Sequence, residues 1–244
     1  MIPLSDELPT VRTPWMTYAI LTAMLLVWIF VQGGGLDYQS LAASVCNLGM
    51  VPGELTHLAP IGRVVSFGPG LPCVVDNDAI NILTPLTSMF LHGGWGHLLG
   101  NCLYFWVFGN NVEDSLGTVR FLFFYLVCGL LAAGAHILAQ PASPIPTVGA
   151  SGAISGVLGG YLILYPRVKV RMLFPFFIMS VRAWLVLVWW FFWQVVAAVP
   201  AFERGGDLGG GVAVWAHVGG FVAGVILVKL FENRGLVVKR LPAR

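Results

Sequence analysis

Charged side chains are scarce in this sequence. Asp, Glu, Lys and Arg make up 10% of the 244 residues, whereas hydrophobic residues make up 57% and the mean hydropathy is +0.83. Because soluble domains carry about 25% charged residues, this composition excludes an ordinary soluble domain. The sequence also lacks basic runs with interleaved aromatic residues, and its net charge is only +2. We therefore expect no nucleic-acid partner.

The N-terminal segment lacks the features of a cleaved leader. Residues 1–14 are polar and carry Asp6, Glu7 and Arg12, which fits neither a signal peptide nor a transit peptide. The first apolar run, residues 15–31, is therefore predicted to be a retained membrane span.

Cysteine is also rare, with four residues in the whole chain. Cys102 and Cys128 fall inside apolar runs, where we expect them to act as small packing residues. Cys46 and Cys73 share a long loop and are candidates for a disulfide in an oxidising compartment. The sequence leaves open whether they pair, since pairing depends on geometry.

Long apolar runs dominate what is present. A helix that crosses a bilayer needs about 20 apolar residues. The runs predict six transmembrane helices, at residues 15–31, 95–112, 118–138, 151–165, 183–202 and 212–231. The expected fold is an all-α polytopic membrane protein. A single membrane domain (15–231) includes a long outer loop (36–83). It lies between a short N-terminal segment (1–14) and a basic tail (232–244).

The distribution of basic residues predicts the orientation. With the N-terminus inside, all but two of the 13 Lys and Arg residues fall in cytoplasmic segments; the exceptions are Arg63 and Arg204. Positive residues are enriched on the cytoplasmic side of membrane proteins. We therefore expect both termini in the cytoplasm of a multi-pass protein. The short N-terminal segment without a transit signal favours the inner (plasma) membrane of a bacterium over an organelle.

Strongly polar side chains stand at the starts of three alternate spans. The second span opens with HGGWGHLLGN, which contains His97 and Asn101; the fourth opens with Ser151, and the sixth contains His217. Such groups are costly inside a bilayer and are functional candidates by default. Alternate spans run in the same direction, so these groups are expected at similar depth near the outer face.

Glycine recurs at every fourth position on two of these spans: Gly152, Gly156 and Gly160 on the fourth, and Gly220 and Gly224 on the sixth. Small residues at this spacing let helices approach closely, and in most membrane helices they mean only tight packing. Packing of these two faces would bring His217 toward Ser151.

These residues allow one kind of covalent chemistry. A serine becomes a nucleophile when a base takes its proton, and histidine is the usual base. Helix-start N–H groups, an Asn amide and an imidazole N–H can stabilise an oxyanion. No Asp or Glu occurs in the outer halves of these spans, so a Ser-His dyad is favoured over a triad. The fourth span, of 15 residues and about 22 Å, is shorter than the hydrocarbon core of about 30 Å, which predicts a polar pocket at its outer end.

Other polar residues have simpler interpretations. His136 is expected at the membrane interface, and Gln194 is expected to bond between helices rather than act on a substrate. Glu113 and Asp114, with Arg120, are interpreted as an inner-surface turn. A lone membrane histidine such as His217 is itself often only a helix–helix hydrogen bonder. The histidine spacing is not typical of zinc sites, so neither a metal nor another cofactor is expected.

Four segments together resemble the rhomboid family of intramembrane serine proteases: HGGWGHLLGN, FGNNVED, GASGAISG and AHVGGFVAG, in that order. The resemblance implies that Ser151 is the nucleophile and His217 the general base. It also implies an oxyanion hole made of Asn101, His97 and the Ser151 backbone N–H. The implied partners are the lipid bilayer and membrane-spanning, usually single-pass, protein substrates cleaved near the outer face.

The chain departs from the family pattern in two places. The first loop has Arg63 but no Trp, where some members have a Trp-Arg pair. Ser155 stands one turn after the nucleophile, where some members have a Tyr that packs on the histidine. What orients His217 is therefore open. A non-catalytic rhomboid-like binding module and a small transporter are the alternative functions.

Overall fold

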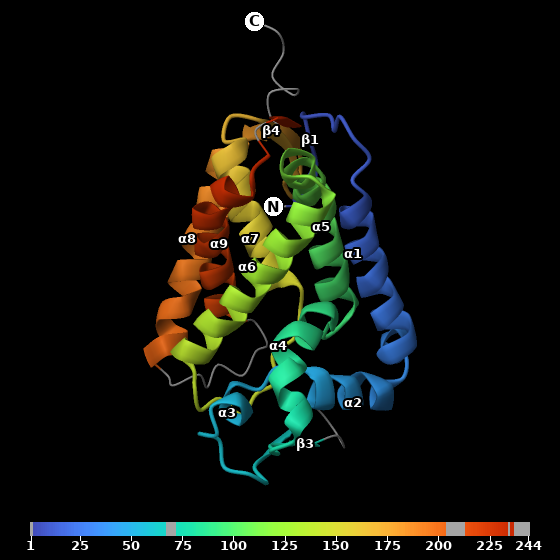
Figure 1. Cartoon of the computed structure of the whole chain (residues 1–244), viewed down its shortest axis with the longest axis vertical. Coiled ribbons are helices and arrows are strands. Elements are labelled where there is room, and N and C mark those ends of the chain that lie inside the picture. Colours follow the sequence, from blue (N-terminus) through green and yellow to red (C-terminus); the bar gives the residue numbers. More distant parts are fainter. Residues whose placement is uncertain (1, 67–71, 204–212, 234, 237–244) are drawn as a thin grey trace, which may run out of the picture.

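The computed structural model describes residues 2–66, 72–203, 213–233 and 235–236. Its long helices run side by side along the longest axis of the molecule (Figure 1). They are α1 (Trp15–Leu26, continued by a π turn at Val27–Val31), α5 (Trp95–Leu116), α6 (Thr118–Ala139), α7 (Ser151–Leu164), α8 (Ala183–Glu203) and α9 (Val214–Phe231). Arg204, Val212 (the first residue of the predicted sixth span) and most of the basic tail lie outside the described residues.

These helices coincide with the six predicted apolar segments. Two of the described helices, α6 and α9, are by themselves long and apolar enough to cross a membrane, whereas Trp15–Val31, Ser151–Leu164 and Ala183–Val199 are apolar but shorter. The number of six spans stays a prediction.

Helix α7 lies at the centre of the bundle. Its residues from Gly152 to Tyr161 are all buried, and it packs against α5, α6 and α9. A helix that is apolar all round is one that other helices enclose. The bundle therefore holds the start of α7, and with it Ser151, in a fixed position.

The long loop after α1 is ordered at one end of the bundle, the lower end in Figure 1. It contains α2 (Tyr38–Leu48), α3 (Pro52–Leu55), the paired strands β2 (Val64–Ser66) and β3 (Pro72–Val74), and a 3-10 turn at Ala79–Leu83. Short helices α4 (Thr84–Thr87) and Ser88–Phe90 lead from it to α5. Cys46 and Cys73 form a disulfide that ties α2 to β3.

A three-stranded antiparallel sheet lies at the other end, so the description of the fold as all-α is too narrow. Its order is β1 (Ile2–Asp6), β4 (Lys169–Leu173), β5 (Ile178–Arg182). Along β4, Val170 and Met172 are buried and Lys169 and Arg171 are exposed, which is the alternation of a strand with one covered face. The protein is mostly helical, with this sheet capping the bundle.

The predicted inner-surface turn at Glu113 and Asp114 is wrong. Both residues lie in the last turns of α5 and are buried. The Glu113 carboxylate accepts hydrogen bonds from the backbone N–H groups of Met16 and Thr17, at 2.9 and 2.8 Å, and from the Thr17 hydroxyl at 2.8 Å. Because α1 has no side-chain cap of its own, Glu113 supplies the acceptors that its free N–H groups need.

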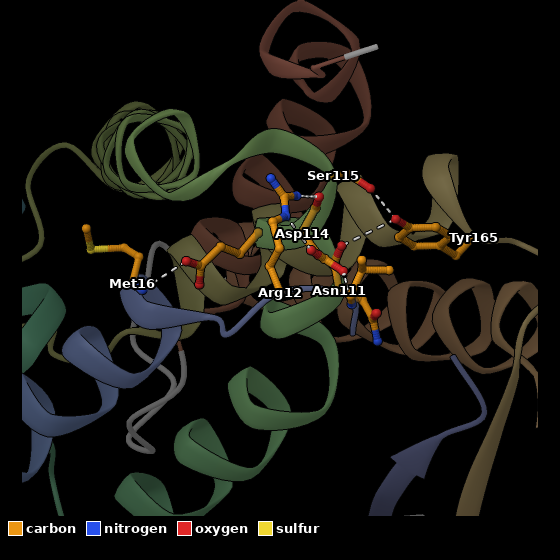
Figure 2. A network of polar contacts seen from close by, with 8 residues as sticks. Arg12, Met16, Asn111, Asp114, Ser115 and Tyr165 are labelled. Carbon is orange, nitrogen blue, oxygen red and sulfur yellow. Dashed lines mark hydrogen bonds and ion pairs between the residues drawn. The ribbon is translucent and has the colours of Figure 1, made fainter. Parts of the chain in front are cut away.

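Asp114 fixes the segment that precedes α1. Its carboxylate accepts a hydrogen bond from the Val11 N–H at 2.7 Å and pairs with the Arg12 guanidinium at 3.0 Å (Figure 2). Arg120 instead donates to the backbone carbonyl of Glu232 at 3.3 Å. The earlier interpretation failed because the partners of this acidic pair come from the chain's N-terminus.

A neighbouring network ties β1 to the bundle. One carboxylate oxygen of Asp6 accepts hydrogen bonds from the Asn111 amide and the Tyr161 hydroxyl, each at 2.6 Å. The Tyr165 hydroxyl forms a hydrogen bond with the Ser115 hydroxyl and donates another to the Asn111 carbonyl at 3.3 Å (Figure 2). This end of the bundle is thus closed by polar contacts, and the candidate site lies at the other end.

Candidate active site

Ser151 and His217 meet between the starts of two helices. Ser151 is the first residue of α7, and His217 lies in the first turn of α9. The Ser151 Oγ and His217 Nε2 are 2.7 Å apart, which is a hydrogen bond between the two side chains. His217 is 9% exposed.

Close packing of α7 and α9 produces this contact. A Cβ added to Gly220 would collide with the carbonyl oxygen of Gly152, and a Cβ added to Gly224 would collide with that of Gly156. The two helix backbones therefore touch where glycine removes the side chain. His217 lies one turn before Gly220, so this approach sets its distance from Ser151.

Gly160 contributes differently from the other predicted glycines. Its nearest neighbours are the side chains of Phe124 and Val228, not the backbone of α9. Gly159, which the every-fourth spacing did not select, faces the backbone carbonyl of Phe221 directly. The close contact therefore drifts by one position along α7, because two helices that cross do not keep one face in register.

The orientation of His217 comes from α8. The Gln194 side-chain oxygen lies 2.8 Å from His217 Nδ1. The expected hydrogen bond of Gln194 between helices is present, and its partner is the histidine beside Ser151. Sequence reasoning could have selected Gln194 as the amide within an otherwise apolar run, but nothing in the run says which helix it faces.

His97 and Asn101 lie on one face of α5 toward Ser151. His97 Nδ1 accepts a hydrogen bond from the Gly93 N–H at 3.4 Å, so the proton of the neutral ring is on Nε2. That nitrogen is so close to Gly149 that a Cβ there would lie 2.6 Å from it. Asn101 Nδ2 is buried and has no hydrogen-bond partner within the described part of the chain.

The four predicted residues line one pocket of about 630 Å³. Trp190 of α8 and Tyr104 of α5 also line this pocket, together with Gly93, Gly94, Gly96 and Gly100 at and near the start of α5. An unpartnered amide donor, an imidazole N–H and a helix start without a side-chain cap thus face the same space as the Ser151 hydroxyl. Together they can bind a negatively charged oxygen.

Two further histidines are placed by the structure. His136 is buried within the protein: it is 5% exposed, and its Nε2 lies 3.1 Å from the Thr147 hydroxyl. His92 is fully buried, its ring packs against that of His97, and the Gln32 side chain bonds to its backbone N–H and carbonyl, each at 2.8 Å. Over the residues that the structure describes, no group of three or more His, Cys, Asp or Glu side chains could hold a metal.

Residues 81–234 match the family model of the rhomboid domain. The chain belongs to the rhomboid family. The match covers α5 to α9 and therefore the four predicted site residues, His97, Asn101, Ser151 and His217. The family acts on transmembrane substrates within the bilayer.

Curated relatives carry the same family name. The chain is 42% identical over 89 residues to rhomboid protease GluP of Bacillus subtilis, covering 36% of this chain and 17% of the relative. It is 37% identical over 79 residues to the putative rhomboid protease YdcA of the same organism, covering 32% and 39%. RHOMBOID-like protein 5 of Arabidopsis thaliana is 27% identical over 165 residues, covering 63% and 52%.

The matched regions span about half or less of these relatives' own lengths. Two of the relatives are named as proteases, which supports an intramembrane protease function for rhomboid chains of this kind.

Proposed function

We propose that this chain is an intramembrane serine endopeptidase that works through a Ser151–His217 dyad. The observation that carries the proposal is the 2.7 Å hydrogen bond between Ser151 Oγ and His217 Nε2, inside a pocket that also contains the Asn101 amide, a donor without a partner among the described residues. The rhomboid relatives named as proteases support the reaction class.

The reaction follows from the positions of these groups. Ser151 Oγ attacks the carbonyl carbon of the scissile peptide bond while its proton passes to His217 Nε2. The bond to the leaving nitrogen then breaks, and the imidazolium returns the proton to that nitrogen. A water molecule, activated by the same imidazole, attacks the ester carbonyl, and its hydrolysis restores the Ser151 hydroxyl.

The negative oxygen formed in each step needs donors fixed in advance. Asn101 Nδ2, His97 Nε2–H and the backbone N–H of Ser151 fit this role, because all three border the space beside the Ser151 hydroxyl. Each such donor is typically worth 10²- to 10³-fold in kcat. The buried and unpartnered Asn101 amide is the strongest support, since a buried donor without an acceptor is costly unless a ligand uses it.

The setting of the reaction is part of the proposal. Six spans with both termini in the cytoplasm would put the pocket near the outer face of the bilayer. The basic residues that the structure describes, Arg63 excepted, lie toward the end of the bundle that carries the sheet, opposite the pocket, and basic residues favour the cytoplasmic side. The substrates would be membrane-spanning proteins, single-pass ones in the first instance. A bacterial inner membrane fits this arrangement.

Labelling with a fluorophosphonate probe tests the dyad in the solubilised full chain. We expect the wild type to be labelled and the Ser151→Ala and His217→Ala variants to be unlabelled, with unchanged thermal unfolding for Ser151→Ala. Ser44→Ala, which removes a serine from α2 outside the pocket, is the matched control and should label normally. A folded wild type that neither labels nor cleaves a transmembrane substrate would favour a non-catalytic binding module.

A further inference from the structure

Two residues of α8 contact the His217 side chain. Gln194 Oε1 lies 2.8 Å from His217 Nδ1. One turn earlier on the same helix, the Trp190 ring packs against the imidazole, with ring centroids 5.9 Å apart. The imidazole thus receives its polar contact and an aromatic contact from a helix other than its own.

Gln194 is an unusual residue for its helix. Between Ala183 and Ala201 it is the only amide or charged side chain. Its neighbours Trp193, Val195 and Val196 are exposed on the outer side of the bundle. An amide in such a run needs a partner, and the described partner is the Nδ1 of His217.

The chemistry of this contact decides where the imidazole carries its proton. An amide oxygen only accepts hydrogen bonds, so the Nδ1 of His217 must be the donor and hold the hydrogen. In the neutral ring the other nitrogen, Nε2, then has a free lone pair. That lone pair faces the Ser151 hydroxyl at 2.7 Å, which is what a general base requires.

The contact also strengthens during the reaction. When Nε2 takes the serine proton, the ring becomes a cation, and its Nδ1–H donates a charge-assisted hydrogen bond to the same oxygen. The Ser155 hydroxyl, one turn after the nucleophile, does not orient the imidazole, because it donates its hydrogen bond to the Ser151 carbonyl at 2.6 Å.

We propose that Gln194 is a positioning residue: its side-chain oxygen selects the tautomer of His217 that can accept a proton from Ser151 and fixes the plane of the ring. This inference rests on the proposed dyad. It assigns to a neutral amide on α8 the orienting role that a carboxylate has in a Ser-His-Asp triad.

The test compares two substitutions of Gln194 in the full chain reconstituted in liposomes, with cleavage of a single-pass transmembrane reporter substrate as the readout. Gln194→Met keeps length and volume but removes the acceptor. We expect kcat to fall roughly 10- to 10³-fold. This is smaller than the loss of about 10⁴-fold that a wrong histidine tautomer causes in serine proteases, because the native amide, unlike a carboxylate, supplies no charge that the variant could lose. KM should stay within about twofold, because Gln194 contacts the imidazole and not the substrate.

Gln194→Glu keeps an acceptor oxygen at the same place and adds a negative charge. We expect it to retain kcat within about tenfold of the wild type. Because the carboxylate stabilises the imidazolium, the inactive protonated ring should persist to higher pH. The acid limb of the pH–rate profile should therefore shift to higher pH. Retention of kcat by Gln194→Glu together with its loss in Gln194→Met separates the acceptor oxygen from mere packing of the side chain, which both variants preserve.

Trp193→Phe is the matched control, since Trp193 is the preceding residue and its described ring contacts are with Trp189 and Phe192. It should leave kcat and the pH profile unchanged. The proposal is overturned if Gln194→Met loses melting temperature but keeps kcat and its pH profile, or if Gln194→Glu is as inactive as Gln194→Met. If Gln194→Met does not fold, the Glu variant alone decides. Loss of the proposed function itself would be seen separately, as a folded wild type without fluorophosphonate labelling.

Discussion

Substitution of Gly149 by alanine tests whether the His97 imidazole must lie where the structure places it. Gly149 has φ +127°, a conformation that favours glycine, and its Cα faces the His97 ring. An alanine Cβ would lie 2.6 Å from His97 Cε1 and Nε2 and 3.5 Å from Ser151 Oγ. Since carbon contacts settle at about 3.5–4.0 Å, the ring must retreat by about 1 Å.

The size of the expected effect follows from that displacement. A misplacement of about 1 Å can cost about 10²-fold in rate, and loss of one oxyanion donor costs 10²- to 10³-fold. We therefore expect kcat of Gly149→Ala to fall roughly 10²- to 10³-fold. The positive φ should also destabilise the fold by roughly 1–2 kcal/mol. Cleavage of a reconstituted transmembrane substrate gives the first quantity, and thermal unfolding gives the second.

Gly62→Ala separates backbone strain from the clash. Gly62 also has a positive φ, +82°, but nothing lies within 4 Å of an added Cβ, and it is in the loop that precedes β2. It should lose similar stability and keep full activity. The reasoning is refuted if Gly149→Ala stays within about threefold of the wild-type kcat, or if Gly62→Ala loses as much activity as Gly149→Ala.

The remaining predictions concern stability away from the pocket. Glu113→Gln should lower the free energy of unfolding by about 2 kcal/mol, because an amide cannot accept all three hydrogen bonds at the start of α1. Glu232→Gln, in a surface pair with Lys229 at 3.0 Å, should cost under about 1 kcal/mol, and an equal loss in chemical denaturation would contradict the capping role. Replacing both Cys46 and Cys73 by Ser should cost about 3.5 kcal/mol by loop entropy for their separation of 27 residues; equal melting temperatures with and without the disulfide would contradict this. Burial raises the pKa of Glu54 above its usual value, and the Asp76 N–H offsets part of that effect. The folded state therefore binds this proton more tightly, so its stabilising effect is complete below the ordinary value near 4.5 and is lost as pH rises through the higher folded value. Stability measured across that range should depend less on pH in Glu54→Gln, and an unchanged slope would show that other groups are responsible.

Errors in the sequence interpretation share one cause. The polar contact of His136 was not predicted, because its partner, the Thr147 hydroxyl, comes from the following loop. Glu113 and Asp114 were grouped with Arg120 because they are close in sequence, yet their partners are residues 11–17. In each case the deciding neighbour comes from another segment, and a local pattern contains no information about it.

The small sheet was missed for a related reason. The alternation of buried and exposed residues along β4 is present in the sequence from Lys169 to Leu173. It spans only five residues; of its two partners, β5 is equally short, and β1 lies at the N-terminal end of the sequence, far from β4 along the chain. A strand this short is stable only when paired, so the pairing had to be known before the strand could be predicted.

The sequence by itself determined the apolar helices, the membrane class and the residue types at the candidate site, because hydrophobicity and glycine spacing are properties of local sequence. The tertiary structure decided three further things: the 2.7 Å distance between Ser151 Oγ and His217 Nε2, the Asn101 amide without a described partner beside them, and the contact of Gln194 with His217 Nδ1. Each of these depends on how two or three helices pack together. That packing is set by contacts between segments far apart in the chain, and only the folded molecule brings them together.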